Sequence, residues 1–172
     1  MISLFKIGIL TASDRCSKGI RKDESGELLK ELAGSLSAEV LAYEILPDDK
    51  VILKEALCKM AKSCDLILTT GGTGLSPRDQ TPEATREIIE KEIPGIPEAL
   101  RASGSKKTPF AILSRGVAGI RGGALIINLP GNPQAVRDAF VILKPILPHM
   151  IDLMKGTVSD CPTSFHSLHL HS

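Results

Sequence analysis

The chain has 172 residues, of which 42% are apolar and 24% are charged. This length and balance suit one globular domain with a proper core. The 21 Lys and Arg residues nearly cancel the 20 Asp and Glu residues, so no overall charge would attract nucleic acid or an anionic membrane. Aromatic residues make up 3% of the chain, too few for a base-stacking surface, and no apolar run approaches the ~18 to 20 residues of a membrane helix. We predict a cytoplasmic protein without a signal peptide and with neither nucleic acid nor membrane as a partner.

Cysteine and histidine both narrow the chemistry. The four cysteines (Cys16, Cys58, Cys64 and Cys161) lack CxxC spacing, which favours reduced thiols over a zinc site or a redox pair. All four histidines lie in the last 24 residues, so a histidine base or a Ser-His-Asp triad is not expected in the body of the domain. A mechanism that needs no imidazole is favoured. Metal binding by the terminal His-x-x-His-x-His run is the less favoured reading of that run.

The first half of the chain alternates strand and helix patterns. Residues 4–10 form an apolar run that predicts a buried strand, followed by a charged loop to about residue 23. Apolar residues at helical spacing predict a helix over 27–36, a strand pattern covers 39–46, and a second helix runs from 47–49 to about residue 63. A strand over 65–70 completes a βαβαβ pattern.

The second half begins with glycines at 71, 72 and 74, after which Thr81 is read as an N-cap and Pro82 as the first residue of a helix that runs to about residue 92. A short helix is expected over 97–104, and 110–115 is ambiguous. Strands over 117–120 and 124–129 could pair as a hairpin. The last helix starts at Asn132-Pro133 and runs to about residue 155, with kinks at its two internal prolines.

These elements predict an α/β fold: a three-layer sandwich with a mostly parallel sheet plus one antiparallel strand, and helices on both faces. We expect the domain to span 1–157. Residues 158–172 are rich in Ser, Pro and His and are expected to form a flexible or surface-draped tail.

Four segments directly follow predicted strands: 11–14, 47–48, 69–74 and 129–133. Because ligands bind beyond the carboxyl ends of the strands in an open α/β sheet, these segments should converge on one rim. They offer hydroxyls, carboxylates, backbone N–H groups and two helix N-termini. This set suits phosphates and a hard cation.

Each motif also has a plainer interpretation. The glycine segment lacks the Lys-Ser/Thr of a Walker A loop and the last glycine of GxGxxG, so it could be a tight turn only. Asp48 could be the N-cap of its helix, and Asp79 could close an Asx turn before Thr81. The functional interpretation has both aspartates holding Mg²⁺ against nucleotide phosphates. Arg115 and Arg121 are candidate phosphate clamps, and a solvated surface position is as plausible for each.

Four motifs stand together at characteristic spacing: TTGGTG at 69–74, followed by PRDQTPEAT at 77–85, then LSR at 113–115, then NLPGNP at 128–133. In this combination the chain resembles the molybdopterin-binding domain family over about residues 5–155. Within that family it is most similar to the stand-alone molybdopterin adenylyltransferases of molybdenum cofactor biosynthesis.

The resemblance implies that ATP and molybdopterin are converted to adenylylated molybdopterin and pyrophosphate with Mg²⁺, and that the protein is a homotrimer in transient contact with other enzymes of this biosynthesis. It implies that Asp48 and Asp79 are catalytic and bind the Mg²⁺-nucleotide. The rim positions Ser13 and Asp14 also match. The resemblance also implies two binding regions. The nucleotide-phosphate loop would be formed by Thr70, Gly71, Gly72, Thr73 and Gly74. Molybdopterin would be bound by Ser114, Arg115, Gly131 and Asn132.

The implied chemistry agrees with the histidine-free domain, because the attacking phosphate is already anionic and needs no general base. Three alternatives remain open: a family branch with the same fold and uncertain activity, a carrier module that binds molybdopterin without turnover, and a generic nucleotide-binding switch. The presence of both Asp48 and Asp79 argues against the carrier. The switch would leave NLPGNP unexplained.

Overall fold

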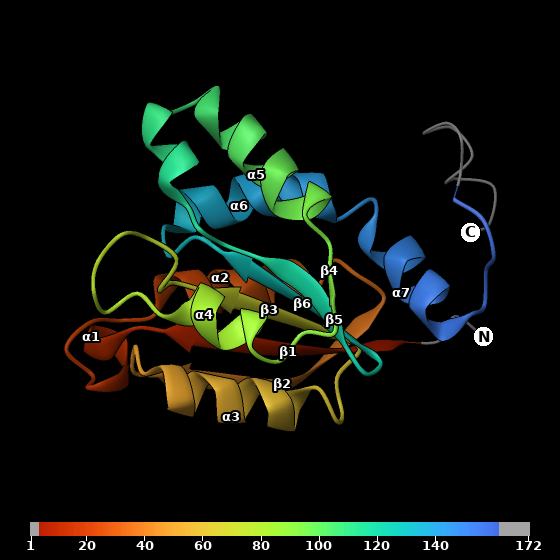
Figure 1. Ribbon diagram of the computed structural model, residues 1–172, viewed down its shortest axis with the longest axis horizontal. Coiled ribbons are helices and arrows are strands. Elements are labelled where there is room, and N and C mark those ends of the chain that lie inside the picture. Colours follow the sequence, from red (N-terminus) through yellow and green to blue (C-terminus); the bar gives the residue numbers. More distant parts are fainter. Residues whose placement is uncertain (1–3, 162–172) are drawn as a thin grey trace.

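The structure, a computed structural model, describes residues 4–161. Its sheet has the order β2-β1-β3-β6-β5-β4 (Figure 1). The first four strands of this order are parallel to one another, and β5 is antiparallel to both β6 and β4. In the described part of the chain a single strand therefore runs against the others, as predicted. The strands are β1 (Phe5–Ala12), β2 (Ala38–Leu46), β3 (Leu66–Thr70), β4 (Lys91–Glu92), β5 (Ala118–Arg121) and β6 (Ala124–Leu129).

The central strands are mostly apolar because helices cover both faces of the sheet. Every residue of β3 and β6 is buried, and so is every residue of β1 except Lys6. One face packs against α2 (Glu24–Ala33), α5 (Gly95–Ser105), α6 (Pro133–Leu143) and α7 (Leu147–Lys155). The other face packs against α3 (Lys50–Met60) and α4 (Thr81–Arg86) (Figure 1). The predicted three layers are confirmed.

Helix starts near the rim are capped by side chains. Asp23 caps α2 by accepting from the Gly26 N–H, Asp49 caps α3 by accepting from two N–H groups, and Asn132 caps α6 with Pro133 at the first helical position. Each cap satisfies donors that the first turn leaves unpaired. These helix starts are thereby fixed beside the carboxyl ends of the strands.

The helix predicted to run to about residue 92 is shorter than expected. α4 begins at Thr81, whose side chain makes no cap, and ends at Arg86. The chain then joins the sheet, because the Glu90 N–H donates to the Ile120 carbonyl and the Ile93 N–H to the Ala118 carbonyl. Ile88 and Ile89, which the prediction placed in this helix, follow α4 and pack into the core on the same face of the sheet.

Other departures are smaller. The charged loop after β1 contains a short helix, α1 (Asp14–Ser17), and the ambiguous segment forms a 3-10 helix, η1 (Pro109–Leu113). The predicted last helix is two helices, since Pro145 has no N–H to continue α6 and α7 begins only at Leu147. His149 belongs to α7, which lies at the opposite end of the molecule from α1 (Figure 1).

α7 ends at Gly156, which adopts a left-handed conformation with φ of 68°. Residues 158–161 are exposed, and the rest of the predicted tail, including its three histidines, lies outside the described residues. The domain boundary at 157 stays a prediction. Across residues 4–161 we find no helix with the length and apolarity needed to span a membrane.

Candidate active site

The four segments predicted to form a rim do converge. They follow β2, β1, β3 and β6, which are adjacent parallel strands. Backbone hydrogen bonds continue the contact beyond the sheet: the Ser13 N–H donates to the Leu46 carbonyl (2.9 Å) and the Gly71 N–H to the Leu129 carbonyl (3.2 Å). The loops after four strands therefore form one continuous surface.

The glycines after β3 are required by the backbone. Gly71 and Gly72 have φ of 87° and 63°, a region that favours glycine. A Cβ on Gly71 would collide with the Ala12 carbonyl, and one on Gly72 with the Thr81 hydroxyl. Gly131 packs directly on Gly71, because a Cβ there would lie 3.2 Å from the Gly71 Cα. The glycines thus form a tight turn, and this turn brings bare backbone to the rim.

These glycines form a wall between two cavities. The larger cavity has a volume of about 620 Å³ and an outer side built from α5, η1 and α6, with Leu100, Phe110 and Ile142 among its lining residues. The smaller one, about 450 Å³, is polar and includes Thr11, Arg21 and Lys22. Both cavities share the same five residues: Gly71, Gly72, Asp79, Gly131 and Asn132. Two ligands, one in each cavity, would meet over this wall, which we call the glycine wall.

Asp48 lies in the smaller cavity with one oxygen engaged and the other free. Its Oδ2 accepts from the Asp14 N–H (2.9 Å), while its buried Oδ1 has no partner. Burial raises the pKa of this carboxyl, despite the Asp14 N–H, which favours ionisation. The alternative that Asp48 caps α3 is wrong, because Asp49 makes that cap. A buried, unpartnered oxygen at a rim facing a polar cavity is suited to a cation.

Asp79 lies at the glycine wall and lines both cavities. Its Oδ2 accepts from the Ser76 N–H at 3.0 Å, and this bond closes the turn that follows the glycines. The side chain therefore stabilises a turn before it in the chain and not, as the alternative had it, one towards Thr81. Gly74 permits this arrangement, since a Cβ there would lie 2.8 Å from Asp79 Oδ2.

The hydroxyls and small residues predicted for the site lie around these two carboxylates. Ser13 lines the smaller cavity and caps α1, where its Oγ accepts from the Cys16 N–H. Thr70 lines the same cavity, and its hydroxyl donates to the Pro130 carbonyl at 2.7 Å. Thr73 and Gly74 line the larger cavity. Asn132 faces both cavities while its Oδ1 caps α6.

Of the two residues predicted from the LSR motif, only Ser114 lines a cavity, the larger one. Arg115 instead braces the loop behind the glycine wall: it donates to the Gly74 carbonyl (2.7 Å) and the Asp79 carbonyl (2.9 Å), and it pairs with Glu83. Arg121 is not at the rim at all. It ends β5, the antiparallel strand, and pairs with Ala124 at the start of β6, so it lies at the end of the strands opposite to the rim and is not a phosphate clamp for this site.

Two buried polar residues were missed as individuals. Asn128 is 3% exposed; its Nδ2 donates to the hydroxyls of Thr69 and Thr85, and its Oδ1 accepts from the Val117 N–H. Asp23 accepts from the hydroxyls of Thr11 and Tyr43, both at 2.6 Å. An Asn inside an apolar strand was a usable signal for the first, because a buried amide needs partners. Asp23 lies in a loop, where the sequence pattern offered no comparable signal.

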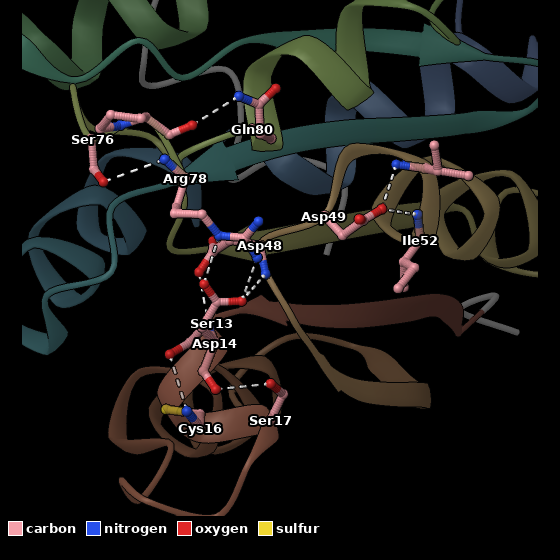
Figure 2. A network of polar contacts seen from close by, with 12 residues as sticks. Ser13, Asp14, Cys16, Ser17, Asp48, Asp49, Ile52, Ser76, Arg78 and Gln80 are labelled. Carbon is pink, nitrogen blue, oxygen red and sulfur yellow. Dashed lines mark hydrogen bonds and ion pairs between the residues drawn. The ribbon is translucent and has the colours of Figure 1, made fainter.

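A third missed residue is Arg78, whose guanidinium forms two hydrogen bonds with the Asp14 carboxylate, both at 2.9 Å (Figure 2). This arginine holds the pKa of Asp14 down at about 2. Asp14 itself lines neither cavity. The sequence placed Asp14 at the rim, but a contact across 64 residues could not be predicted from spacing.

Known proteins resemble this chain over most of its length. The family described as "Probable molybdopterin binding domain" matches residues 8–149. The chain belongs to this family. A molybdopterin adenylyltransferase of Helicobacter pylori strain J99 is 44% identical over 154 residues, which cover 87% of this chain and 88% of the relative. The molybdopterin adenylyltransferase of Escherichia coli K12 is 36% identical over 171 residues, covering 90% and 88%.

Solved structures agree with the fold. The molybdopterin biosynthesis enzyme MoaB of Thermus thermophilus superposes with a TM-score of 0.84 at 48% identity, covering 89% of this chain and 98% of its own. The tungsten cofactor synthesizing protein MoaB of Pyrococcus furiosus gives 0.83 at 34% identity, with 89% and 98% covered. The α/β fold identified from the sequence is therefore that of these enzymes.

Proposed function

We propose that this protein is a molybdopterin adenylyltransferase, which transfers AMP from ATP to the terminal phosphate of molybdopterin and releases pyrophosphate. The observation that carries the proposal is the pair of cavities, one mainly apolar and one polar, that meet at a wall of glycine backbone beside a carboxylate with a free oxygen. A reaction between two bound phosphates needs this arrangement. The names of the relatives support the same activity.

Each cavity suits one substrate. The smaller cavity has the cations Arg21 and Lys22 and the carboxylate of Asp48, which suit a triphosphate. The larger cavity has Ser114 and an apolar outer side, which suit a flat pterin ring system with few polar groups fixing its orientation. We therefore assign ATP to the smaller cavity and molybdopterin to the larger one.

Chemically, an oxygen of the molybdopterin phosphate attacks the α-phosphorus of ATP. The new P–O bond forms as the bond from the α-phosphorus to the bridging oxygen breaks, and its electron pair leaves with pyrophosphate. The nucleophile carries its charge already, so no residue has to remove a proton. The chain contributes position: at Gly71, Gly72 and Gly131 the glycine wall presents only backbone, which lets the two phosphates approach closely there.

Mg²⁺ fits the residues at the rim. It uses one or two carboxylates together with substrate phosphates and water, and within residues 4–161 no group of three or more His, Cys, Asp or Glu could form an all-protein metal site. Asp48, through its free Oδ1, and Asp79 would hold it. When bound, it supplies positive charge that offsets the charge of the phosphate oxygens.

The experiment is pyrophosphate release from Mg-ATP, with and without molybdopterin, by the wild type, Asp48→Asn and Asp49→Asn. Asp49→Asn is the matched control, because asparagine caps a helix as well as aspartate does. We expect molybdopterin-dependent release that Asp48→Asn abolishes and Asp49→Asn keeps. No release by the wild type, combined with tight molybdopterin binding, would favour the carrier module.

The homotrimer, the cytoplasmic location and the transient contacts with other enzymes of this biosynthesis remain part of the proposal. Light scattering on the purified protein at micromolar concentration checks the first of these. A monomer mass at that concentration would refute it.

A further inference from the structure

Asp14 and Asp48 are joined by two reciprocal hydrogen bonds (Figure 2). The Asp14 N–H donates to Asp48 Oδ2 at 2.9 Å, and the Asp48 N–H donates to Asp14 Oδ1 at 3.0 Å. The two residues come just after β1 and β2, so this exchange locks together the ends of neighbouring strands. It also fixes which oxygen of Asp48 is engaged and leaves Oδ1 as the free one.

Arg78 completes the arrangement from a third element. It lies in the loop between β3 and α4, next to Asp79, and its Nε and Nη2 each donate to one oxygen of Asp14. With the Asp48 N–H included, both oxygens of Asp14 are engaged by donors. Both oxygens of Asp14 are thus held by the protein, and Asp14 lines neither cavity.

The charges explain why the arginine is needed. The negative charges of Asp14 and Asp79 both lie close enough to Asp48 to add to the rise of its pKa that burial causes. The guanidinium is a fork that matches one carboxylate in two places, which a lysine cannot do. It cancels the charge of Asp14 and holds its orientation. Because the Arg78 side chain is 60% exposed, such a pair adds little to stability, and its value lies in geometry.

We propose that Asp14 and Arg78 are positioning residues that present the free oxygen of Asp48 to the cation of the nucleotide, and that neither residue binds the cation itself. The inference rests on the proposed function, since it concerns the same site. The Arg78–Asp14 pair and the two Asp14–Asp48 hydrogen bonds together link the loop carrying Asp79 to the loop carrying Asp48. These contacts help to set the relative position of the two carboxylates that would share the cation.

The test replaces the arginine in two steps. Arg78→Lys keeps the charge and loses the fork, and Arg78→Gln loses both. Arg86→Gln is the matched control: the same change eight residues along the chain, at an exposed position in the last turn of α4. Unfolding by urea confirms that all variants are folded, which the exposure of both arginines favours.

The readout is binding of Mn²⁺, followed by electron paramagnetic resonance, in the presence of α,β-methylene-ATP, which the transfer reaction cannot cleave. Because partners that orient a metal ligand typically change affinity by about 10- to 100-fold, we expect Arg78→Gln to weaken Mn²⁺ binding by at least about tenfold, with Arg78→Lys in between. The Arg78 variants should bind molybdopterin with the affinity of the wild type, and Arg86→Gln should bind Mn²⁺ as the wild type does.

Two results would overturn the proposal. In one, Arg78→Gln binds Mn²⁺ as the wild type does, whatever its turnover, which would make the ion pair irrelevant to Asp48 or place Arg78 on the substrate. In the other, Arg78→Lys is as weak as Arg78→Gln although Asp14→Asn binds normally. Failure of the proposed function looks different: the wild type itself would release no pyrophosphate and would show no nucleotide-dependent Mn²⁺ binding.

Discussion

Replacing Asp48 by asparagine should stabilise the protein while abolishing turnover. Asp48 is 9% exposed, and its buried Oδ1 has no hydrogen-bond partner. A buried acceptor without a partner costs about 1–3 kcal/mol. Asparagine still offers an oxygen to the Asp14 N–H. It leaves an unpartnered NH2 group in the place of Oδ1, but this group is neutral, and a charged group without a partner costs more than a neutral one. Since the cavity beside Asp48 admits water, we take the low end and expect a gain of about 1 kcal/mol at pH 7, or roughly 2–4 °C in Tm.

The pH dependence follows from the raised pKa of Asp48. Folding lifts this pKa above its ordinary value of 3.8, so the folded protein binds more protons than the unfolded chain between the two values. As pH falls through the raised pKa, the wild type recovers the stability that the ionised carboxylate costs. The asparagine variant has nothing to recover. The gap between the two proteins should therefore be largest at neutral pH and shrink as pH falls.

The assay is urea unfolding of the wild type, Asp48→Asn and Asp49→Asn, in EDTA and without nucleotide, from pH 7 down to pH 4. Asp49→Asn should stay within about 0.5 kcal/mol of the wild type, because asparagine serves equally as an N-cap. Adding Mg-ATP should then stabilise the wild type and not Asp48→Asn, since ligands stabilise the state they bind. The reasoning is refuted if Asp48→Asn is less stable than the wild type at pH 7, or if the gap widens as pH falls.

Three further predictions concern single side chains. Gly72→Ala should lower the free energy of unfolding by more than about 2 kcal/mol, because the new Cβ meets Thr81. Gly122→Ala is the control: it is also at positive φ but has open space around it, so it should cost only the backbone strain of about 1 kcal/mol. Equal losses of the two variants in urea unfolding would contradict the collision. Asn128→Ala breaks three buried hydrogen bonds and should cost about 3 kcal/mol by the same assay; a loss below 1 kcal/mol would mean that water replaces them. Arg78→Gln should raise the pKa of Asp14 from about 2 towards 3.8, seen as a shifted carboxyl titration by NMR; an unchanged midpoint would show that Arg78 does not hold it.

The parallel strands could be predicted from the sequence in chain order, because strands buried on both faces are continuous apolar runs. Once β1, β2, β3 and β6 are accepted as parallel, the convergence of the loops after them follows from geometry alone. The prediction of a helix to about residue 92 was wrong because a distant contact, and not the local pattern, decides where this helix ends. The chain leaves the helix because the N–H groups of Glu90 and Ile93 bond to carbonyls of β5, a strand far along the chain, and nothing within the segment itself shows this pairing.

At the site, residue types and places were predictable, but partners were not. Asp48 and Asp79 could be placed at the rim by their positions after β2 and β3. That Asp48 would have one free oxygen depends on Asp14, and the state of Asp14 depends on Arg78. Arg115 illustrates the same limit, because the chain brings it behind the glycine wall, where it binds carbonyls. Contacts of this kind depend on folding that brings distant residues within hydrogen-bond reach.

The glycine wall has a consequence for how such a protein can change. Because three of the five residues that both cavities share are glycines with no room for a Cβ, substitutions have little to act on where the reacting groups would meet. Substitutions remain possible on the outer sides, around Leu100 and Phe110 in one cavity and around Arg21 and Lys22 in the other. These two sides belong to different segments of the chain and share no residue. The preference for either substrate could therefore be engineered independently of the other, with the geometry of the reaction left as it is.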